Sequence, residues 1–240
     1  MKYPAGCVFS LAEKNAPIPG CTVSEAVSSG ETDAVCFSLA AGTDISAEIY
    51  FSPKLLIAAA GTLEVSLPAG QFRTLHALDA IVTPADVPVG THTDTSAVYL
   101  EINIGRNQSM NQAVKTGEVF RLGELVPYQD GKIVNMDVTS SKTMKFALMA
   151  FDAGTGLSEH AAPGDALIFA LDGEGVIGYE GEEHVIHAGE NFRFARGGKH
   201  YVALSWVCTE GEVTDERFAE LSGLSAGDEF TFTCGGEEIT

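Results

Sequence analysis

Two histidines have the residue type and the setting to do metal chemistry. His160 stands at the head of the apolar run LSEHAAPGDALIFALDGEG, and His200 follows forty residues later. Neutral imidazole is a common ligand of zinc, iron, nickel, copper and manganese. Because a catalytic metal usually has three or more protein ligands, two histidines alone would hold one weakly. A third ligand would come from Tyr179, Glu182, His184 or a substrate; otherwise the two histidines line a pocket without a metal.

A second group combines a carboxylate, a phenol and an amine: Glu48, Tyr50 and Lys54. An acid and an amine can transfer protons or bind a polar ligand. They also form structural ion pairs, whose electrostatics resemble those of active sites. The sequence favours a structural interpretation, either a Glu48–Lys54 ion pair or a strand end open to solvent, over the functional one.

Other motifs carry no chemistry. The stretch GEGVIG, residues 173–178, matches G-x-G-x-x-G, but a hairpin pattern follows it instead of a helix, so no dinucleotide site is implied. The sequence has no Walker loop, and its cysteines lack a convincing histidine partner. Nucleophilic catalysis by a cysteine therefore has no support.

Composition narrows the class of partner. The 240 residues include 33 acids and 14 bases, for a net charge of −19, which would repel nucleic acid. Five cysteines without a CxxC pair are typical of free thiols in a reducing compartment. The start lacks the apolar core of a signal peptide, and no apolar stretch approaches the roughly 18 residues of a membrane span. We expect a cytoplasmic protein whose partner is a small molecule, not a membrane or nucleic acid.

The elements that position these residues are short strands. Apolar runs of strand length, such as LLIAAA, AVYLEINI and ALIFAL, recur between turn signals, and VIGYEGEEHVIHAGE reads as a hairpin. Runs at this spacing, together with 26 glycines, predict an all-β protein of the small barrel or sandwich type.

The chain contains an internal repeat of about 110 residues. Residues 8–29 align with 119–141, and ISAEIYFSPKLLIAAAGTLEV (45–65) runs without a gap against LSEHAAPGDALIFALDGEGVI (157–177). Because a unit of this length is the size of a domain, the repeat predicts two similar domains, 1–112 and 113–240, that arose by duplication.

A shorter sequence repeat occurs in three segments. GCVFSL (6–11), GEVFRL (117–122) and GDEFTF (227–232) recur at steps of 111 and 110 residues. We expect 117–122 to help close the first barrel and 227–232 to help close the second; chance similarity of short strands is the alternative.

With these motifs in place, the chain resembles the cupin superfamily, specifically a two-domain bicupin. The first cupin motif, G-x5-H-x-H-x3-E-x6-G, fits from Gly154 to Gly173 without a gap and puts His160 at the first histidine. The second, G-x5-P-x-G-x2-H-x3-N, fits from Gly189 and puts His200 at its histidine. The resemblance implies two tandem RmlC-like jelly-roll barrels and a metal held inside the barrel by these motif positions.

The same alignment to the cupin motifs shows which metal ligands are missing. Ala162 stands where the second histidine belongs, and Ala166 stands where the acid belongs, so the implied metal site of the C-terminal barrel is degenerate. In the N-terminal half the first-motif positions hold Glu48, Tyr50 and Lys54, which the resemblance would point into the barrel.

The predicted function is therefore that of a small-molecule-binding bicupin. The C-terminal barrel would hold its pocket, lined by His160 and His200, with Ala162 and Ala166 opening space there. The N-terminal barrel would be mainly structural, with Glu48, Tyr50 and Lys54 as its polar group. One alternative is a metal-dependent dioxygenase or isomerase, with zinc, iron, nickel or manganese on His160 and His200. A second alternative is a structural protein without a ligand. The resemblance also implies a homodimer.

Overall fold

A computed structural model describes residues 3–28, 34–106, 108–141 and 144–203, and the backbone of the strands at 232–234 and 237–239. The chain divides into two compact units, Met1–Ser205 and Trp206–Thr240. In the second unit, β20 (Phe232–Cys234) pairs antiparallel with β21 (Glu237–Ile239). Strands dominate the described residues, so the all-β prediction is confirmed, and no described helix is long and apolar enough to cross a membrane.

The first half of the larger unit is built on one sheet of nine strands, ordered β11-β7-β5-β9-β3-β2. Off this path, β6 and β8 pair with β5, and β4 pairs with β8. Its own strands are β2 (Thr22–Ser28), β3 (Ala34–Ala40), β4 (Thr43–Ile49), β5 (Lys54–Leu67), β6 (Gln71–His76), β7 (Asp79–Val82), β8 (Pro88–Thr93) and β9 (Ser96–Asn103). The short helices of the larger unit are α1 (Leu11–Lys14), η1 (Pro68–Gly70) and η2 (Leu122–Glu124).

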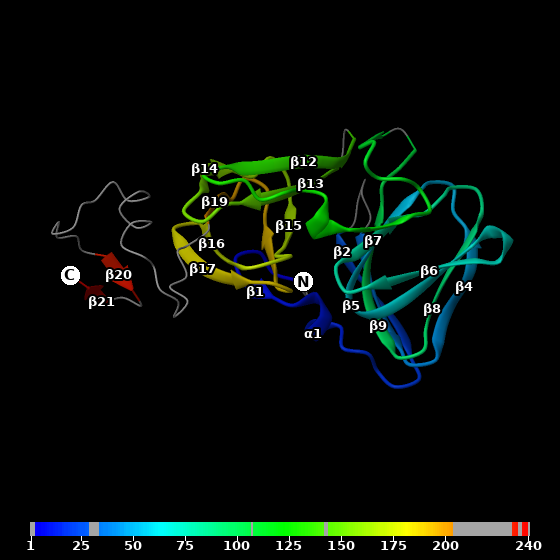
Figure 1. The fold of residues 1–240 in the computed structure, drawn as a ribbon. Coiled ribbons are helices and arrows are strands. Elements are labelled where there is room, and N and C mark those ends of the chain that lie inside the picture. The colour runs from blue at the N-terminus through cyan, green and yellow to red at the C-terminus, as the bar shows by residue number, and fades with distance from the viewer. Residues whose placement is uncertain are drawn as a thin grey trace. The chain divides into compact units, whose positions relative to one another are not determined.

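The 14-residue strand β5 organises this half, because it pairs with β6, β7, β8 and β9 (Figure 1). Its register against β9 shifts between Ala58 and Ala60. Gly61 follows with φ of +76°, and a Cβ there would lie 2.1 Å from the carbonyl oxygen of Ser96. Only glycine allows so close an approach of two backbones. Gly61 therefore allows β5 to continue past the register shift and to pair in two parts of the sheet.

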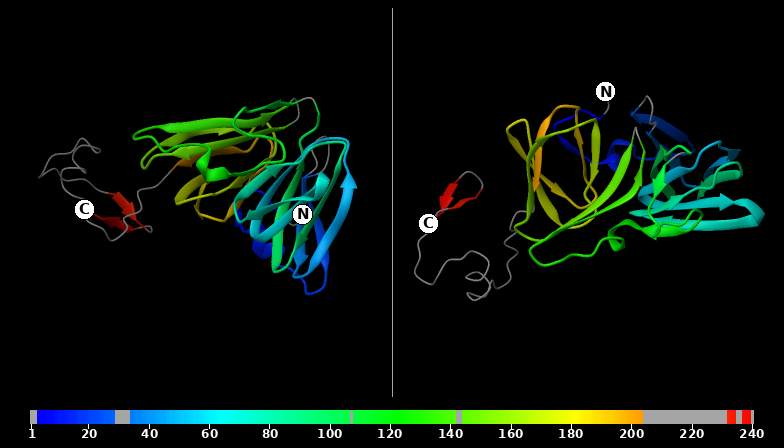
Figure 2. Two further views of the ribbon diagram at one scale, coloured as in Figure 1. Left: turned by 45° about the vertical axis from the view of Figure 1, so that its right-hand side comes forward. Right: turned by 90° about the horizontal axis from the view of Figure 1, so that it is seen from above.

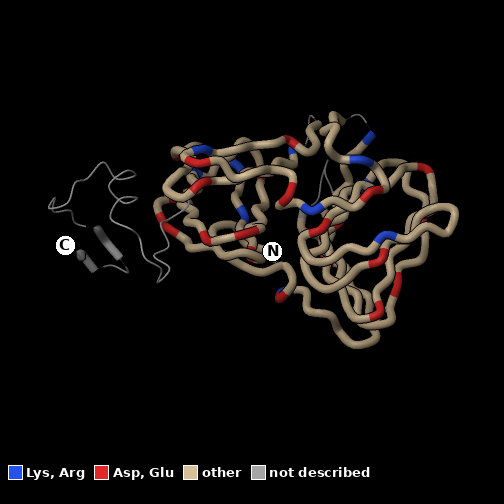
Figure 3. Tube along the Cα trace, viewed as in Figure 1, with Lys and Arg blue, Asp and Glu red and all other residues tan. Residues whose placement is uncertain are grey.

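The second half holds three smaller sheets, ordered β1-β18-β15, β10-β12-β13 and β14-β19-β16-β17. Its strands are β10 (Ser109–Met110), β11 (Val119–Arg121), β12 (Ile133–Ser140), β13 (Lys145–Phe151), β14 (Gly156–Ala161), β15 (Ala166–Phe169), β16 (Glu174–Tyr179), β17 (Glu182–His187), β18 (Asn191–Phe194) and β19 (Lys199–Ala203). Figure 3 shows acidic residues spread over both halves, with fewer basic residues among them.

The two halves exchange a short strand. The first strand of the chain, β1 (Val8–Phe9), pairs with β18 of the second half, and β11 pairs with β7 of the first half. The right-hand view of Figure 2 shows the blue N-terminal segment beside the yellow strands of the second half. Segment 117–122 was predicted to help close a first barrel; its strand β11 does pair with the first half, but closure of a barrel stays a prediction. Residues 227–231 lie outside the described residues, so their predicted role stays untested; the reciprocal role of β1 was missed.

Apolar clusters fill both the first half and its contact with the second. Strand alternation turns Leu56 and Ala58 of β5 into the first-half core and turns Leu55 and Ile57 toward the second half. There Leu55 and Ile57 share a cluster that includes Leu148. The two halves of the larger unit are therefore joined by a continuous buried contact.

The finer architecture stays a prediction. Strands such as β6 and β17 recur 111 residues apart, at Gln71–His76 and Glu182–His187, which agrees with the sequence repeat. No sheet of the described residues closes into a barrel, however. Two tandem barrels, their origin by duplication and the boundary at residue 112 therefore remain predictions.

Candidate functional site

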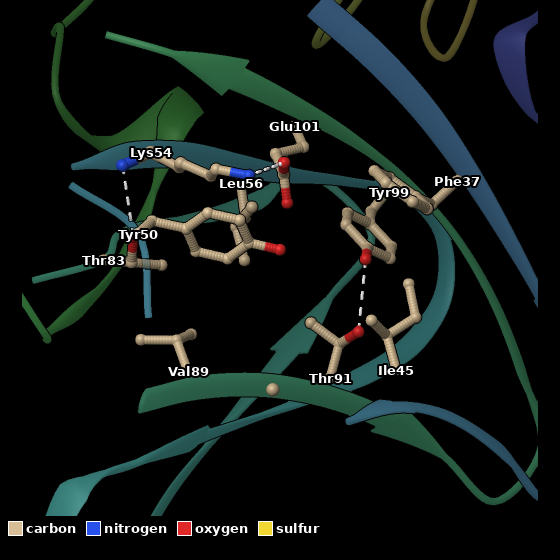
Figure 4. A pocket seen from close by; sticks show the side chains of 11 residues that line it. Phe37, Ile45, Tyr50, Lys54, Leu56, Thr83, Val89, Thr91, Tyr99 and Glu101 are labelled. Carbon is tan, nitrogen blue, oxygen red and sulfur yellow. Dashed lines mark hydrogen bonds and ion pairs between the residues drawn. The ribbon is translucent and has the colours of Figure 1, made fainter. Parts of the chain in front are cut away.

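A small pocket lies in the first half of the chain (Figure 4). Its volume is about 20 Å³, which is room for one or two water-sized groups. The residues that line it are Phe37, Ile45, Tyr50, Lys54, Leu56, Thr83, Val89, Gly90, Thr91, Tyr99 and Glu101.

Strand alternation places the two charged residues of the pocket together. Lys54 opens β5, Glu101 lies in β9, and the ladder sets Leu56 directly opposite Glu101. Lys54 and Glu101 are therefore diagonal neighbours on one face of the sheet, within reach of long side chains. Tyr99, two residues before Glu101, projects to the same face.

The Lys54 ammonium forms an ion pair with the Glu101 carboxylate, and both side chains are 15% exposed. The ammonium also lies 3.3 Å from the centre of the Tyr50 ring, which is a cation–π contact. The Tyr50 hydroxyl donates a hydrogen bond to Glu48 Oε2 at 2.8 Å. Burial and the bond to Glu48 raise the pKa of Tyr50, so the phenol stays protonated. Figure 4 shows Lys54 extending over the Tyr50 ring toward Glu101.

A second polar pair lies at the other end of the pocket. The hydroxyls of Thr91 and Tyr99 lie 3.2 Å apart in a hydrogen bond, and Phe37 stacks on Tyr99 with ring centres 5.1 Å apart. Burial raises the pKa of Tyr99, so this hydroxyl is also neutral. Apolar side chains, among them Leu56 and Val89, form the remaining wall. The pocket thus combines an ion pair, a pair of hydroxyls and an apolar surface.

Part of this site was predictable from the sequence. Tyr50 and Lys54 line the pocket, and Glu48 contacts it through the Tyr50 hydroxyl. The expected Glu48–Lys54 pair is wrong, since Lys54 pairs with Glu101, which the strand register brings closer. Glu101 was missed; its only signal was a lone acid within the apolar run AVYLEINI.

The two histidines of the second half also meet. His160 of β14 and His200 of β19 are direct cross-strand partners, and their ring centres lie 4.3 Å apart. His200 is buried and stacks on Phe194 at 4.0 Å, whereas His160 is exposed and its Nδ1 lies 2.9 Å from the carbonyl oxygen of Ser158. The two residues that the motif spacing singled out, forty positions apart in the sequence, therefore lie side by side in the structure.

The residues around this pair fit a metal poorly. Ala162 is buried, Ala166 is half-buried, and neither offers a donor atom. The Tyr179 hydroxyl accepts a hydrogen bond from the backbone N–H of Ala195. In the part of the chain that the structure describes, no three His, Cys, Asp or Glu side chains form a group able to hold a metal ion. Two imidazoles supply fewer ligands than a stable site needs.

We therefore predict weak metal binding. Zinc titrated into the protein should bind through His160 and His200 so loosely that gel filtration removes it, and His160→Ala should abolish the calorimetric signal. His187→Ala, at a separate exposed histidine, is the matched control and should leave the signal unchanged. Zinc retained in stoichiometric amount through gel filtration would show that a further ligand completes the site.

A pH-dependent contact joins Asp165 to β18 and the residues that follow it. Asp165 accepts hydrogen bonds from the backbone N–H of Arg196 at 2.9 Å and from Arg193 Nη2 at 3.0 Å. The bond from the Arg196 backbone, with help from Arg193, lowers the pKa of Asp165. Its carboxylate therefore stabilises the fold above the pKa of the unfolded chain, near 3.9, and loses that effect as the pH falls through the lower folded value.

Asp165→Asn should accordingly lower the free energy of unfolding by about 0.5–1 kcal/mol at pH 7, a modest value because the side chain is half exposed. The difference from wild type should shrink as the pH falls below about 4. Urea unfolding at pH 7 and at low pH measures this, and a difference that stays constant with pH would disprove the role of the charge.

Comparisons with known proteins agree with this fold. Residues 147–205 match the family model described as Cupin domain, while no curated protein matches the sequence. A cupin 2 conserved barrel domain protein from Leptotrichia buccalis superposes with a TM-score of 0.76 at 23% identity, covering 86% of this chain and 94% of the other.

More distant structures share the fold alone. The protein Ylba from E. coli superposes with a TM-score of 0.54 at 9% identity, covering 84% of this chain and 88% of its own. Oxalate decarboxylase OxdC of Bacillus subtilis, an enzyme with Mn(II) centres, gives 0.50 at 14% identity, covering 84% and 74%. The family match over residues 147–205 and the superpositions agree that the chain has the cupin fold.

Proposed function

We propose that this chain is a small-molecule-binding bicupin whose ligand enters the pocket of the first half, at Lys54, Glu101 and Tyr50. The observation that carries the proposal is the pocket itself, in which an ion pair and two hydroxyls converge on an apolar wall. Sites for small molecules combine an apolar lining with a few placed polar groups in this way.

The ion pair is accessible to a ligand in the pocket. A Lys–Glu pair that served only the fold would contribute little, because desolvation offsets much of its attraction. This one lines a pocket and keeps 15% of each side chain exposed. A ligand that enters can therefore reach both charges without disrupting the sheet.

The architecture and setting complete the proposal. Two tandem barrels, 1–112 and 113–240, would derive from the duplication that the repeat indicates. The free thiols of Cys7 and Cys21 support a reducing, cytoplasmic setting. A homodimer follows from the family resemblance. The second half would act chiefly as structural support, with a degenerate metal site.

A metal-dependent enzyme is the second candidate. The contact between His160 and His200 favours it, and so does the fold shared with an oxalate decarboxylase that has Mn(II) centres. The small set of donors disfavours it, because the described residues add no third ligand. The zinc titration above separates the two candidates.

A thermal-shift screen of small metabolites tests the proposal. The wild type is compared with Lys54→Met/Glu101→Leu, which removes both charges and should keep the fold. The surface pair supplies the control Lys115→Met/Glu118→Leu. A ligand at a hundredfold excess over its Kd stabilises a protein by about 2.7 kcal/mol. Hits should raise the melting temperature of the wild type and the control but not that of the pocket variant. Hits that stabilise all three alike would place the binding site elsewhere.

A further inference from the structure

We infer that the pocket selects uncharged ligands carrying a primary carboxamide, and that Glu101 is the residue that sets this selectivity. The inference rests on the proposed function, because it names the chemical class of ligand for the same pocket.

The charges around the pocket disfavour ionic ligands. Its only charged lining residues in the described chain are Lys54 and Glu101, which neutralise each other. Glu48 adds a negative charge just beyond Tyr50, and the whole chain carries −19. A carboxylate would have to displace Glu101 from the ammonium, and a cation would have to sit beside Lys54. Like charges brought together in a partly desolvated site are costly.

The remaining hydrogen-bonding capacity matches a carboxamide. The Lys54 ammonium has three N–H donors. One is directed to Glu101, and the face of the Tyr50 ring lies beside the ammonium. A further N–H is therefore available to a ligand. The Glu101 carboxylate keeps free acceptor positions, since two oxygens offer about four. The Tyr50 hydroxyl is engaged by Glu48. The pocket thus presents a donor beside an acceptor, as the carbonyl and NH2 of a carboxamide require.

The size of the pocket agrees with this head group. The volume of about 20 Å³ admits one or two water-sized groups, which corresponds to the oxygen and nitrogen of a single carboxamide. The apolar remainder of a ligand would then contact the wall formed by Ile45, Leu56 and Val89.

The test uses three probes of one shape: isobutyramide, isobutyrate and isobutyramidinium. Methyl NMR follows the resonances of Ile45, Leu56 and Val89 during each titration. In the wild type, isobutyramide should bind at least about tenfold more tightly than either ion, a difference of about 1.4 kcal/mol. In Glu101→Gln the unpaired Lys54 should reverse the order, so that isobutyrate binds best. Glu118→Gln, at an exposed ion pair, should behave as wild type.

Each outcome decides the inference. Preference for isobutyrate or isobutyramidinium in the wild type overturns it, and so does an unchanged order in Glu101→Gln. Lack of any response to all three probes also overturns it, while the thermal-shift screen reports separately on whether the pocket binds small molecules. If Glu101→Gln does not fold, Lys54→Met/Glu101→Leu takes its place and should lose the preference for the amide.

Discussion

Deletion of residues 1–15 is expected to leave the rest of the chain unable to fold. Tyr3 and Leu11 are fully buried and Phe9 is 6% exposed, although all three belong to a terminal segment. Removing a buried leucine or phenylalanine side chain costs about 2–5 kcal/mol. The combined loss approaches the total stability of a typical domain, about 5–15 kcal/mol. Far-UV circular dichroism and urea unfolding would measure it.

Hydrogen bonds to the second half add to this loss. The backbone N–H of Leu11 donates to Asn191 Oδ1 at 2.9 Å, and Arg193 donates to the carbonyl oxygen of Tyr3 at 3.0 Å. Without the N-terminal segment, both polar side chains of the second half lose a partner. Unsatisfied buried groups of this kind cost about 1–3 kcal/mol each.

A point variant gives a finer test of the same segment. Phe9→Ala should lower the free energy of unfolding by about 3–5 kcal/mol, the usual cost for a buried aromatic ring. Phe72→Ala, at a ring that is 62% exposed, is the matched control and should stay within about 0.5 kcal/mol of wild type. Equal urea midpoints for the two variants would show that β1 does not hold the halves together.

The second large effect concerns the ion pair of the pocket. Lys54→Met should lower the free energy of unfolding by about 3 kcal/mol, because it leaves the Glu101 carboxylate largely buried without its partner. The double variant Lys54→Met/Glu101→Leu should recover most of that loss, since apolar side chains replace both charges. A double-mutant cycle by urea unfolding measures the coupling between the two residues.

The exposed pair of Lys115 and Glu118 serves as the control for this cycle. Its side chains are 71% and 60% exposed, and its coupling should be below about 0.5 kcal/mol. A coupling between Lys54 and Glu101 as small as this would mean that solvent screens the pocket pair, and Glu101 could then not set the ligand selectivity.

Much of the fold was predictable because it depends on the length of the apolar runs and on the spacing of the repeated segments. The short apolar runs predicted an all-β chain. The repeat of GCVFSL as GEVFRL predicted that 117–122 helps close a first barrel, and β11 of this segment does pair with β7 of the first half. What the repeat could not reveal is the partner of the first copy. A two-residue strand such as β1 carries no signal for which sheet it joins, and here it joins the second half.

The site was harder to predict because it depends on register. Motif spacing put Tyr50 and Lys54 at pocket positions, but the partner of Lys54 is set by the pairing of β5 with β9, 47 residues further along the chain. Glu48 is nearer in sequence, and it bonds instead to the Tyr50 hydroxyl. A single sequence contains no information on cross-strand neighbours at that separation.

Locating a bound ligand is the most direct test of the central claim, that the pocket of the first half is the binding site. The strongest hit of the thermal-shift screen should be titrated into methyl-labelled protein. The largest shift changes are expected at Ile45, Leu56 and Val89, and they should vanish in Lys54→Met/Glu101→Leu. Largest changes at Ala162 and Val202, near His160 and His200, would contradict the claim and assign binding to the second half.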